Sequence, residues 1–175
     1  MESNSALQNA IDLIRPWVVE SRTPEANRLD AIVLSTNLYA AVSALVKAHW
    51  GYLSAITGLD TLNPATVATP TGDENTAQPT CLEALYHFCQ GAAIFTIRIS
   101  ILRQNPIIPS ICGVLPSASL YERELMELFG IEIIGTPNTD RLLLADDLPV
   151  GIYPMRKDFK GFDTEIDKAP ENKLS

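Results

Sequence analysis

The sequence predicts an α+β fold in which a mostly antiparallel sheet is covered by helices on one face and is followed by an irregular C-terminal segment. Three observations support this prediction. Apolar residues recur at helical spacing in three separate stretches. Two strand-like stretches are adjacent in sequence and are joined by a short turn. After Gly130 the apolar periodicity ends, and Gly, Pro and Asp recur among clustered charges.

The first part of the chain predicts two helices and two strands. The first helix should end near Arg15, because Pro16 lacks the backbone donor that a helix interior requires. Three favourable N-cap residue types, Ser35, Thr36 and Asn37, precede the second helical stretch. In order, we expect a helix, an extended piece, a turn, a strand, a helix and a strand over residues 7–15, 17–21, 22–27, 29–34, 38–46 and 50–59.

Residues 61–80 have a different character from their surroundings. They hold three prolines and no apolar period, which predicts a mobile surface loop. Beyond the loop, residues 82–89 and 93–102 predict a hairpin that turns at Gln90-Gly91. In its second strand, Phe95 begins a strict alternation of apolar and more polar residues. One face of this strand should therefore lie in the core.

The third helix is predicted from local signals at both of its ends. Ser119 and Glu122 match a capping box, and Gly130 stands at the C-cap position after Phe129. Residues 105–109 carry two prolines and should form an edge or a turn, and residues 111–115 could form a short further strand. We therefore divide the chain into an α+β domain over residues 1–130 and an irregular partner-binding segment and tail over residues 131–175.

Composition excludes several classes of function. The formal net charge is −8 and the pI is about 4.7, which argues against a nucleic-acid binder. Three cysteines without a CxxC pair and two histidines argue against an iron–sulfur cluster or a structural zinc site within this chain. We expect no signal peptide and no transmembrane segment. Only 19% of the residues are charged, which suggests that a partner covers part of the surface.

The third helix carries a cluster of charged residues. Arg123 and Glu127 are four residues apart and are predicted to pair on a solvated face, for about 0.3–0.5 kcal/mol. An alternative is a free-standing small α+β enzyme that uses Glu122 or Glu127 as an acid or base. A third hypothesis is a regulatory binding module that uses the loop over residues 61–80.

Two further charged runs follow the third helix, over residues 140–147 and 153–158. Pro154 fixes the local backbone, and an arginine held in such a segment, such as Arg156, can make bidentate contacts to carboxylates. Proline- and charge-bearing segments without periodicity are more typical of a clamp on another protein than of a tail. The alternative for both runs is a solvated tail.

These runs carry a resemblance to a known family. Tyr121-Glu-Arg-Glu-Leu-Met-Glu-Leu-Phe-Gly-Ile131, Gly135-Thr-Pro137, Arg141-Leu-Leu-Leu-Ala-Asp-Asp147 and Tyr153-Pro-Met-Arg-Lys-Asp-Phe159 resemble the signature of the C subunit (thirty-kilodalton subunit) family of complex I. The family includes related subunits of energy-converting membrane-bound NiFe hydrogenases. Four positions depart from the family's usual pattern: Glu127 replaces an aspartate, Thr136 a histidine, Ala145 a proline and Leu148 an aromatic residue. These departures suggest a divergent branch of the family and slightly favour the hydrogenase type.

The resemblance implies a non-catalytic structural or assembly subunit in the hydrophilic arm of a complex-I-related membrane-bound respiratory oxidoreductase. The parent complex would be of the NADH:quinone dehydrogenase type or the energy-converting NiFe hydrogenase type. This chain would carry no cofactor and no metal. It would pack on the hydrogenase-like large subunit, beside partner subunits that hold iron–sulfur clusters and, in the hydrogenase branch, a nickel–iron centre. It would be a peripheral subunit on the cytoplasmic side of the membrane.

The resemblance also implies roles for particular residues. Those in the third helix would hold it against its loops or a neighbour, and the charged residues further on would anchor the segment across an interface. The implied interface and structural residues are Glu122, Arg123, Glu127, Gly135, Pro137, Arg141, Asp146, Asp147, Pro154, Arg156, Lys157 and Asp158.

Overall fold

The structure is a computed structural model that describes residues 2–61 and 81–162. The loop predicted over residues 61–80 therefore lies outside the described residues apart from Thr61, and so does the tail beyond residue 162. The elements are α1 (Glu2–Ile14), a 3-10 turn (Arg15–Trp17), β1 (Val18–Glu25), β2 (Arg28–Val33), a 3-10 turn (Ser35–Asn37), α2 (Leu38–Lys47), β3 (Tyr52–Thr61), β4 (Cys81–Gln90), β5 (Ala93–Leu102), β6 (Ile107–Pro109), α3 (Ala118–Phe129) and β7 (Glu132–Ile134).

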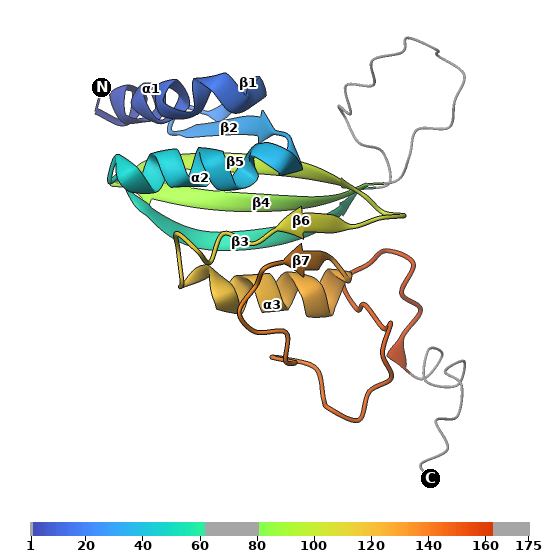
Figure 1. The fold of residues 1–175 in the computed structure, drawn as a ribbon. Coiled ribbons are helices and arrows are strands. Elements are labelled where there is room, and N and C mark those ends of the chain that lie inside the picture. The colour runs from blue at the N-terminus through green and yellow to red at the C-terminus, as the bar shows by residue number, and fades with distance from the viewer. Residues whose placement is uncertain (1, 62–80, 163–175) are drawn as a thin grey trace.

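The described strands form two sheets. The larger has five strands in the order β1-β2-β5-β4-β3, and the smaller consists of β6 and β7 (Figure 1). Within the larger sheet, β1–β2, β3–β4 and β4–β5 are antiparallel, whereas β2 and β5 are parallel. The prediction of a mostly antiparallel α+β fold is confirmed.

The pairing register separates an apolar face of the sheet from a more polar one. Tyr86 lies opposite Ile97, and Phe88 lies opposite Phe95, and all four side chains are buried. α1 and α2 lie side by side across this face (Figure 1), and Ile14 and Leu45 from the two helices belong to the same buried core. The hydrophobic core therefore sits between this face and the helices, as the alternation in β5 predicted.

α3 packs against β3 on the same apolar face. Leu125 and Phe129 are buried, and a Cβ atom at Gly58 would overlap the Phe129 ring. Glycine at position 58 thus lets the helix approach the strand closely. Gly130 ends α3 with φ +65°, which confirms the predicted C-cap, and its missing side chain leaves room for the ring of Tyr153.

Three local predictions are wrong. The turn expected over residues 22–27 is largely strand, because β1 continues to Glu25; Pro24 is tolerated there since β1 is an edge strand. Residues 111–115 form a turn instead of a strand, with the N–H of Val114 donating to the carbonyl of Ile111. Residues after Gly130 are not all irregular, because β7 pairs in parallel with β6.

The predicted capping box is also wrong. α3 begins at Ala118, so Ser119 already lies within the first turn, and the N-cap residue Ser117 makes no capping hydrogen bond through its side chain. Glu122 points inward instead of back to the helix start, and its side chain is fully buried. The local sequence matched the motif, but a non-local partner holds the carboxylate.

Candidate functional site

The carboxylate of Glu122 lies inside the molecule between α3 and the turn that follows β6. It accepts hydrogen bonds from the Ser110 hydroxyl (2.8 Å), the Ile111 backbone N–H (2.7 Å) and the Cys112 thiol (3.2 Å). Burial, and secondly this carboxylate, raises the pKa of the Tyr86 phenol far above its ordinary value. Glu122 therefore fixes the turn to the helix and offers no exposed carboxylate to a substrate.

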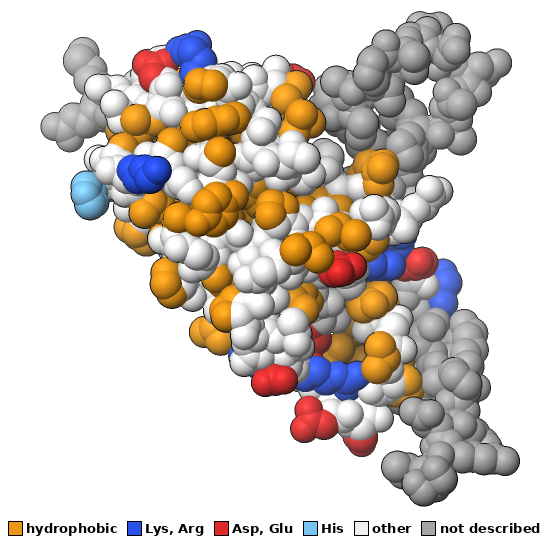
Figure 2. Space-filling view, viewed as in Figure 1, with side chains coloured by type: hydrophobic (Ala, Val, Ile, Leu, Met, Phe, Trp, Pro, Cys, Tyr) orange, Lys and Arg blue, Asp and Glu red, His pale blue; other side chains and the backbone are white. Residues whose placement is uncertain are grey.

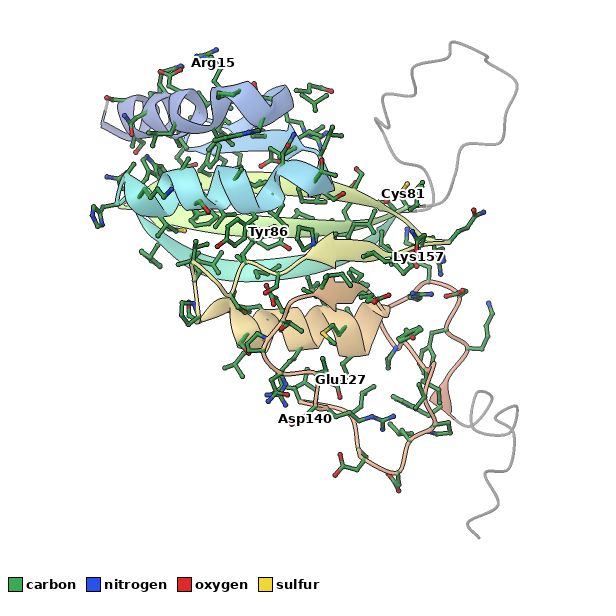
Figure 3. The ribbon with its side chains drawn as sticks, viewed as in Figure 1. Arg15, Cys81, Tyr86, Glu127, Asp140 and Lys157 are labelled. Carbon is green, nitrogen blue, oxygen red and sulfur yellow. The ribbon has the colours of Figure 1, made fainter. Side chains whose placement is uncertain are left out.

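Arg123 and Glu127 hold the chain that follows β7. Arg123 donates to the carbonyl oxygens of Asp140 (2.8 Å) and Arg141 (2.6 Å). Glu127 points from α3 toward the stretch that carries Asp140 (Figure 3). Its carboxylate accepts the backbone N–H groups of residues 142, 143 and 144 at 3.1, 2.8 and 2.6 Å. The predicted Arg123–Glu127 pair is thus replaced by contacts from both side chains to one loop.

Arg141 organises the same loop from within. Its guanidinium donates to the carbonyl oxygens of Ala145 and Leu148, the latter at 2.6 Å. We call residues 140–150 the clipped loop, because Arg123, Glu127 and Arg141 all hold its backbone. Charge-assisted hydrogen bonds of this kind are among the stronger ones in proteins, so the loop has a defined shape without regular secondary structure.

Arg156 holds the second charged run against the end of α3. Its Nε donates to the carbonyl oxygen of Phe129 (2.6 Å), and its guanidinium lies 4.3 Å from the centre of the Tyr153 ring. A cation at this position also interacts favourably with the helix dipole. The expected bidentate contact of Arg156 to a carboxylate is not what the described residues show, because its partners are backbone carbonyls.

Asp60, at the end of β3, ties the second charged run to the sheet. Its carboxylate accepts hydrogen bonds from Arg103 (2.6 and 2.7 Å) and from the backbone N–H of Lys157 (2.7 Å). Arg103 also pairs with Asp158 at 2.6 Å. Sequence reasoning did not identify Asp60 or Arg103 as site residues, since they are 43 residues apart and neither lies in a motif.

The remaining predicted site residues lie in the connecting stretches. Gly135 adopts φ +86° directly after β7, a conformation that favours glycine, and Pro137 follows it. Asp146 and Asp147 are exposed on the clipped loop, Pro154 is partly buried between Tyr153 and Met155, and the side chains of Lys157 and Asp158 are exposed. The predicted residues thus gather in two places: around α3 with the clipped loop, and at the Asp60–Arg103 pair.

A second polar cluster, which sequence reasoning missed, lies on the face of the sheet opposite the core. Arg98 lies between Asp30 (3.1 Å) and Glu83, and His87 lies between the hydroxyls of Thr96 (3.0 Å) and Thr57 (3.2 Å). Burial, and secondly the charge of Arg28, lowers the pKa of His87. The alternation of apolar and polar residues in β5 indicated a polar face. It did not indicate which neighbouring strands would supply the hydrogen-bond partners of Arg98 and His87.

A hollow of about 220 Å³ lies between α3 and the clipped loop, with Arg123, Glu127, Arg141 and Tyr153 in its lining. The side chains of Arg123, Glu127 and Arg141 are already engaged with backbone atoms. In residues 2–61 and 81–162, no group of three or more His, Cys, Asp or Glu side chains could hold a metal ion. No helix in the same part of the chain is long and apolar enough to cross a membrane.

Comparisons with curated proteins find relatives among the subunits of hydrogenases and NADH-quinone oxidoreductases. The chain is 42% identical over 66 residues to the beta subunit of the membrane-bound hydrogenase of Pyrococcus furiosus, covering 38% of each chain. It is 37% identical over 81 residues to the C subunit of the NADH-quinone oxidoreductase of Moorella thermoacetica, covering 45% of this chain and 53% of that one. The matches thus span about half or less of these relatives' lengths.

A longer relative and a solved structure extend the comparison. The C/D subunit of the NADH-quinone oxidoreductase of Chromohalobacter salexigens is 35% identical over 71 residues, which are 41% of this chain and 12% of that one. A chain in the structure of the membrane-bound sulfane sulfur reductase, an archaeal respiratory membrane complex, shares the fold with a TM-score of 0.72 at 18% identity, covering 96% of this chain and 91% of that one.

A family model described as the 30 kDa subunit of respiratory-chain NADH dehydrogenase matches residues 32–165. This range runs from β2 through α3 and the clipped loop to beyond Arg156, and so includes every site residue predicted from the sequence. The resemblance noted in the charged runs is confirmed over most of the chain, and the chain belongs to the family of the 30 kDa subunit of respiratory-chain NADH dehydrogenase.

Proposed function

We propose that this chain is a non-catalytic structural and assembly subunit of a complex-I-related, membrane-bound respiratory oxidoreductase, and that it packs on a hydrogenase-like large subunit. One observation carries the proposal. The stretch with the family's signature is locked to α3 by Arg123 and Glu127 and forms a shaped surface, with Leu143 exposed at its outer side. A surface ordered before binding loses less conformational entropy when it meets a partner.

The names of the relatives support the choice of partner. They are subunits of hydrogenase and NADH-quinone oxidoreductase complexes, and in the C/D relative the matched part is 12% of one longer chain. In the C/D relative, the matched segment and a much longer polypeptide form one chain. Where the two parts are separate chains, we expect them to be neighbours in the complex. On this basis the large subunit, with iron–sulfur subunits nearby, is the proposed partner.

The same proposal includes location and cofactors. The chain is a peripheral subunit on the cytoplasmic side, held at the membrane through its partners. The redox groups belong to those partners: iron–sulfur clusters in either type of complex, and a nickel–iron centre in the hydrogenase type. The role of this chain is to hold its neighbours in a fixed arrangement.

The alternative of a free-standing enzyme has less support from the geometry. An acid or base must come within hydrogen-bond reach of a substrate proton. Glu122 is fully buried and engaged with residues 110–112, and Glu127 accepts three backbone N–H groups. Both carboxylates are therefore engaged in holding the structure together.

Affinity purification of the tagged full-length chain from its native cells tests the proposal. We expect a large subunit to co-purify in a 1:1 ratio with this chain. Its sequence should be similar to the part of the C/D relatives that lies outside the matched segment. We also expect visible redox absorbance in that complex but not in the isolated chain. Cysteine pairs for a nickel–iron centre in the large subunit would indicate the hydrogenase type. A chain that is recovered alone, or that turns over a metabolite by itself, would contradict the proposal.

A further inference from the structure

Four charged residues of the signature make their hydrogen bonds within this chain. Arg123 and Glu127 bind the backbone of the clipped loop, Arg141 binds two of its carbonyl oxygens, and Arg156 binds the carbonyl oxygen of Phe129. A guanidinium or carboxylate that is engaged in this way is held in place and has fewer donors or acceptor sites left for a partner. Their engagement argues against these residues as the direct contacts across an interface.

The clipped loop exposes large apolar side chains. Leu143 is 60% exposed, and Val150, at the rim of the hollow beside α3, is 94% exposed. Single exposed apolar residues are common on protein surfaces, but these two stand on one loop whose backbone is fixed from behind. Figure 2 shows apolar side chains interspersed with charged ones over this part of the molecule. Rigid apolar side chains surrounded by polar ones are the usual composition of an interface centre and its rim.

Two carboxylates stand on the same loop as these apolar side chains. Asp146 and Asp147 are exposed on the same loop, whereas Asp158 in the next charged run pairs with Arg103. The basic side chain within the loop, Arg141, is turned toward its carbonyl oxygens. The exposed side chains of the loop are therefore apolar or acidic, although its sequence carries charges of both signs.

We infer that Arg123, Glu127 and Arg141 act as internal clips, and that the partner is contacted by Leu143 and Val150 with Asp146 and Asp147 at the rim. The inference rests on the proposed function and specifies its partner: the large subunit offers an apolar hollow bordered by Lys or Arg side chains. A second copy of this chain fits less well, because each copy has a net charge of −8 and would place acidic surfaces together.

The test compares variants of the tagged full-length chain purified from native cells. The double variant Leu143→Asp/Val150→Asp places two carboxylates in the proposed apolar hollow, and we expect the co-purified large subunit to fall by about tenfold or more. Leu34→Asp is the matched control, because Leu34 is 58% exposed but lies ahead of α2, away from the clipped loop. The control should retain the wild-type yield.

A second double variant tests the rim. Asp146→Lys/Asp147→Lys reverses two charges and should reduce the yield most at low salt, because charges at a rim are screened as salt rises. The four substituted side chains are exposed, so the thermal midpoint of each isolated variant should stay close to wild type. That measurement separates loss of binding from loss of folding.

The outcomes distinguish the two proposals. Wild-type chain that brings down no large subunit overturns the proposed function, and this inference with it. Wild-type chain that assembles normally, together with a Leu143→Asp/Val150→Asp variant that assembles equally well, overturns the inference and leaves the proposed function standing. Loss of self-association instead of large-subunit binding would assign the surface to a second copy and also overturn the inference.

Discussion

The backbone N–H of Leu143 donates a 2.8 Å hydrogen bond to the carboxylate of Glu127, sixteen residues earlier in the chain. The neighbouring N–H groups of Leu142 and Leu144 bind the same carboxylate. One side chain on α3 thus accepts hydrogen bonds from three consecutive backbone N–H groups. In a helix or a sheet, such groups would donate to backbone carbonyl oxygens instead. The three bonds to Glu127 explain how the clipped loop keeps its shape while being neither helix nor strand.

Glu127→Ala should release the clipped loop. The N–H groups of Leu142, Leu143 and Leu144 lose a charged acceptor, so their hydrogen exchange should speed up by about tenfold or more. The free energy of unfolding should fall by only about 1–2 kcal/mol, because the loop is partly exposed. Glu124→Ala on the same helix is the control and should leave these amides unchanged. Equal exchange in both variants would contradict the role given to Glu127.

Glu122→Ala should destabilise the whole fold. It leaves the hydroxyl of Ser110 and the N–H of Ile111 without their acceptor in a buried site and creates a cavity. The expected loss in the free energy of unfolding is about 3–5 kcal/mol. Glu122→Gln keeps the volume but replaces one acceptor oxygen with an NH2 group, which faces the donors of residues 110–112. It should lower the free energy of unfolding by about 2 kcal/mol. Urea denaturation measures both, and Glu132→Gln, at an exposed position on β7, serves as the control. A loss for Glu122→Ala no larger than that of the control would refute this account.

Asp60 and Asp158 allow a comparison of a buried and an exposed partner of the same arginine. The Asp60 side chain is 1% exposed and that of Asp158 is 69% exposed, and both bind Arg103. Asp60→Asn should cost about 3 kcal/mol or more, because the largely buried Arg103 loses its main partner. Asp158→Asn should cost less than about 1 kcal/mol, as exposed ion pairs usually do. Similar losses for the two variants in thermal or urea unfolding would show that Asp60 is not the main anchor.

His87 should make the stability depend on pH in a defined direction. Burial, and secondly Arg28, lowers its pKa below the ordinary value of 6.5, so protonation is harder in the folded chain than in the unfolded one. The unfolded state then binds more protons, and stability should fall as the pH decreases from about 6.5 through the lower folded pKa. His87→Gln should reduce this slope in thermal midpoints measured across that range.

His49 is the matched control for this measurement. It is exposed, and it is the other of the two histidines in the sequence. His49→Gln should keep the wild-type pH slope, because the His49 side chain is exposed and lies outside the polar cluster around His87. A slope that His87→Gln leaves intact would assign the pH dependence to other groups.

Arg156→Ala should loosen the second charged run in the isolated chain as well as weaken assembly. The variant loses the donor to the carbonyl oxygen of Phe129 and the contact with the Tyr153 ring. Arg156→Lys keeps the charge but not the planar donor group, so it should restore assembly only in part. Lys157→Ala is the control, since its side chain is exposed and its backbone N–H to Asp60 remains. Weakened assembly with unchanged hydrogen exchange over residues 153–159 would point to direct partner contact by Arg156.

The sequence predicts those parts of the fold whose signals are local. α1, α2 and α3 follow from apolar spacing, and the β4–β5 hairpin follows from alternation around Gly91. The parallel pairing of β2 with β5 and of β6 with β7 has no local signal, because the partners are separated by other elements. Pro24 misled for the same reason: whether proline is tolerated depends on whether its strand lies at an edge.

The candidate site shows the same division. The charged residues of the signature could be picked out by composition, but their partners could not. The four-residue spacing on the helix favoured an ion pair between Arg123 and Glu127. In the structure, the clipped loop offers backbone carbonyl oxygens to Arg123 and backbone N–H groups to Glu127 instead. Asp60 and Arg103 meet only after β3 and β5 have been placed in the sheet.

The strand order β1-β2-β5-β4-β3 has a consequence for how the molecule forms. The N-terminal hairpin of β1 and β2 reaches its place only when β5 arrives, and the N–H of Ile94 on β5 bonds to the carbonyl of Asn27 in that hairpin's turn. The ribosome must therefore synthesise the chain through β5, whose last residue is Leu102, before the central parallel pair can close. Such long-range closure slows folding and leaves the early hairpin exposed to wrong pairings, so chaperone dependence during synthesis should be greatest before β5 emerges.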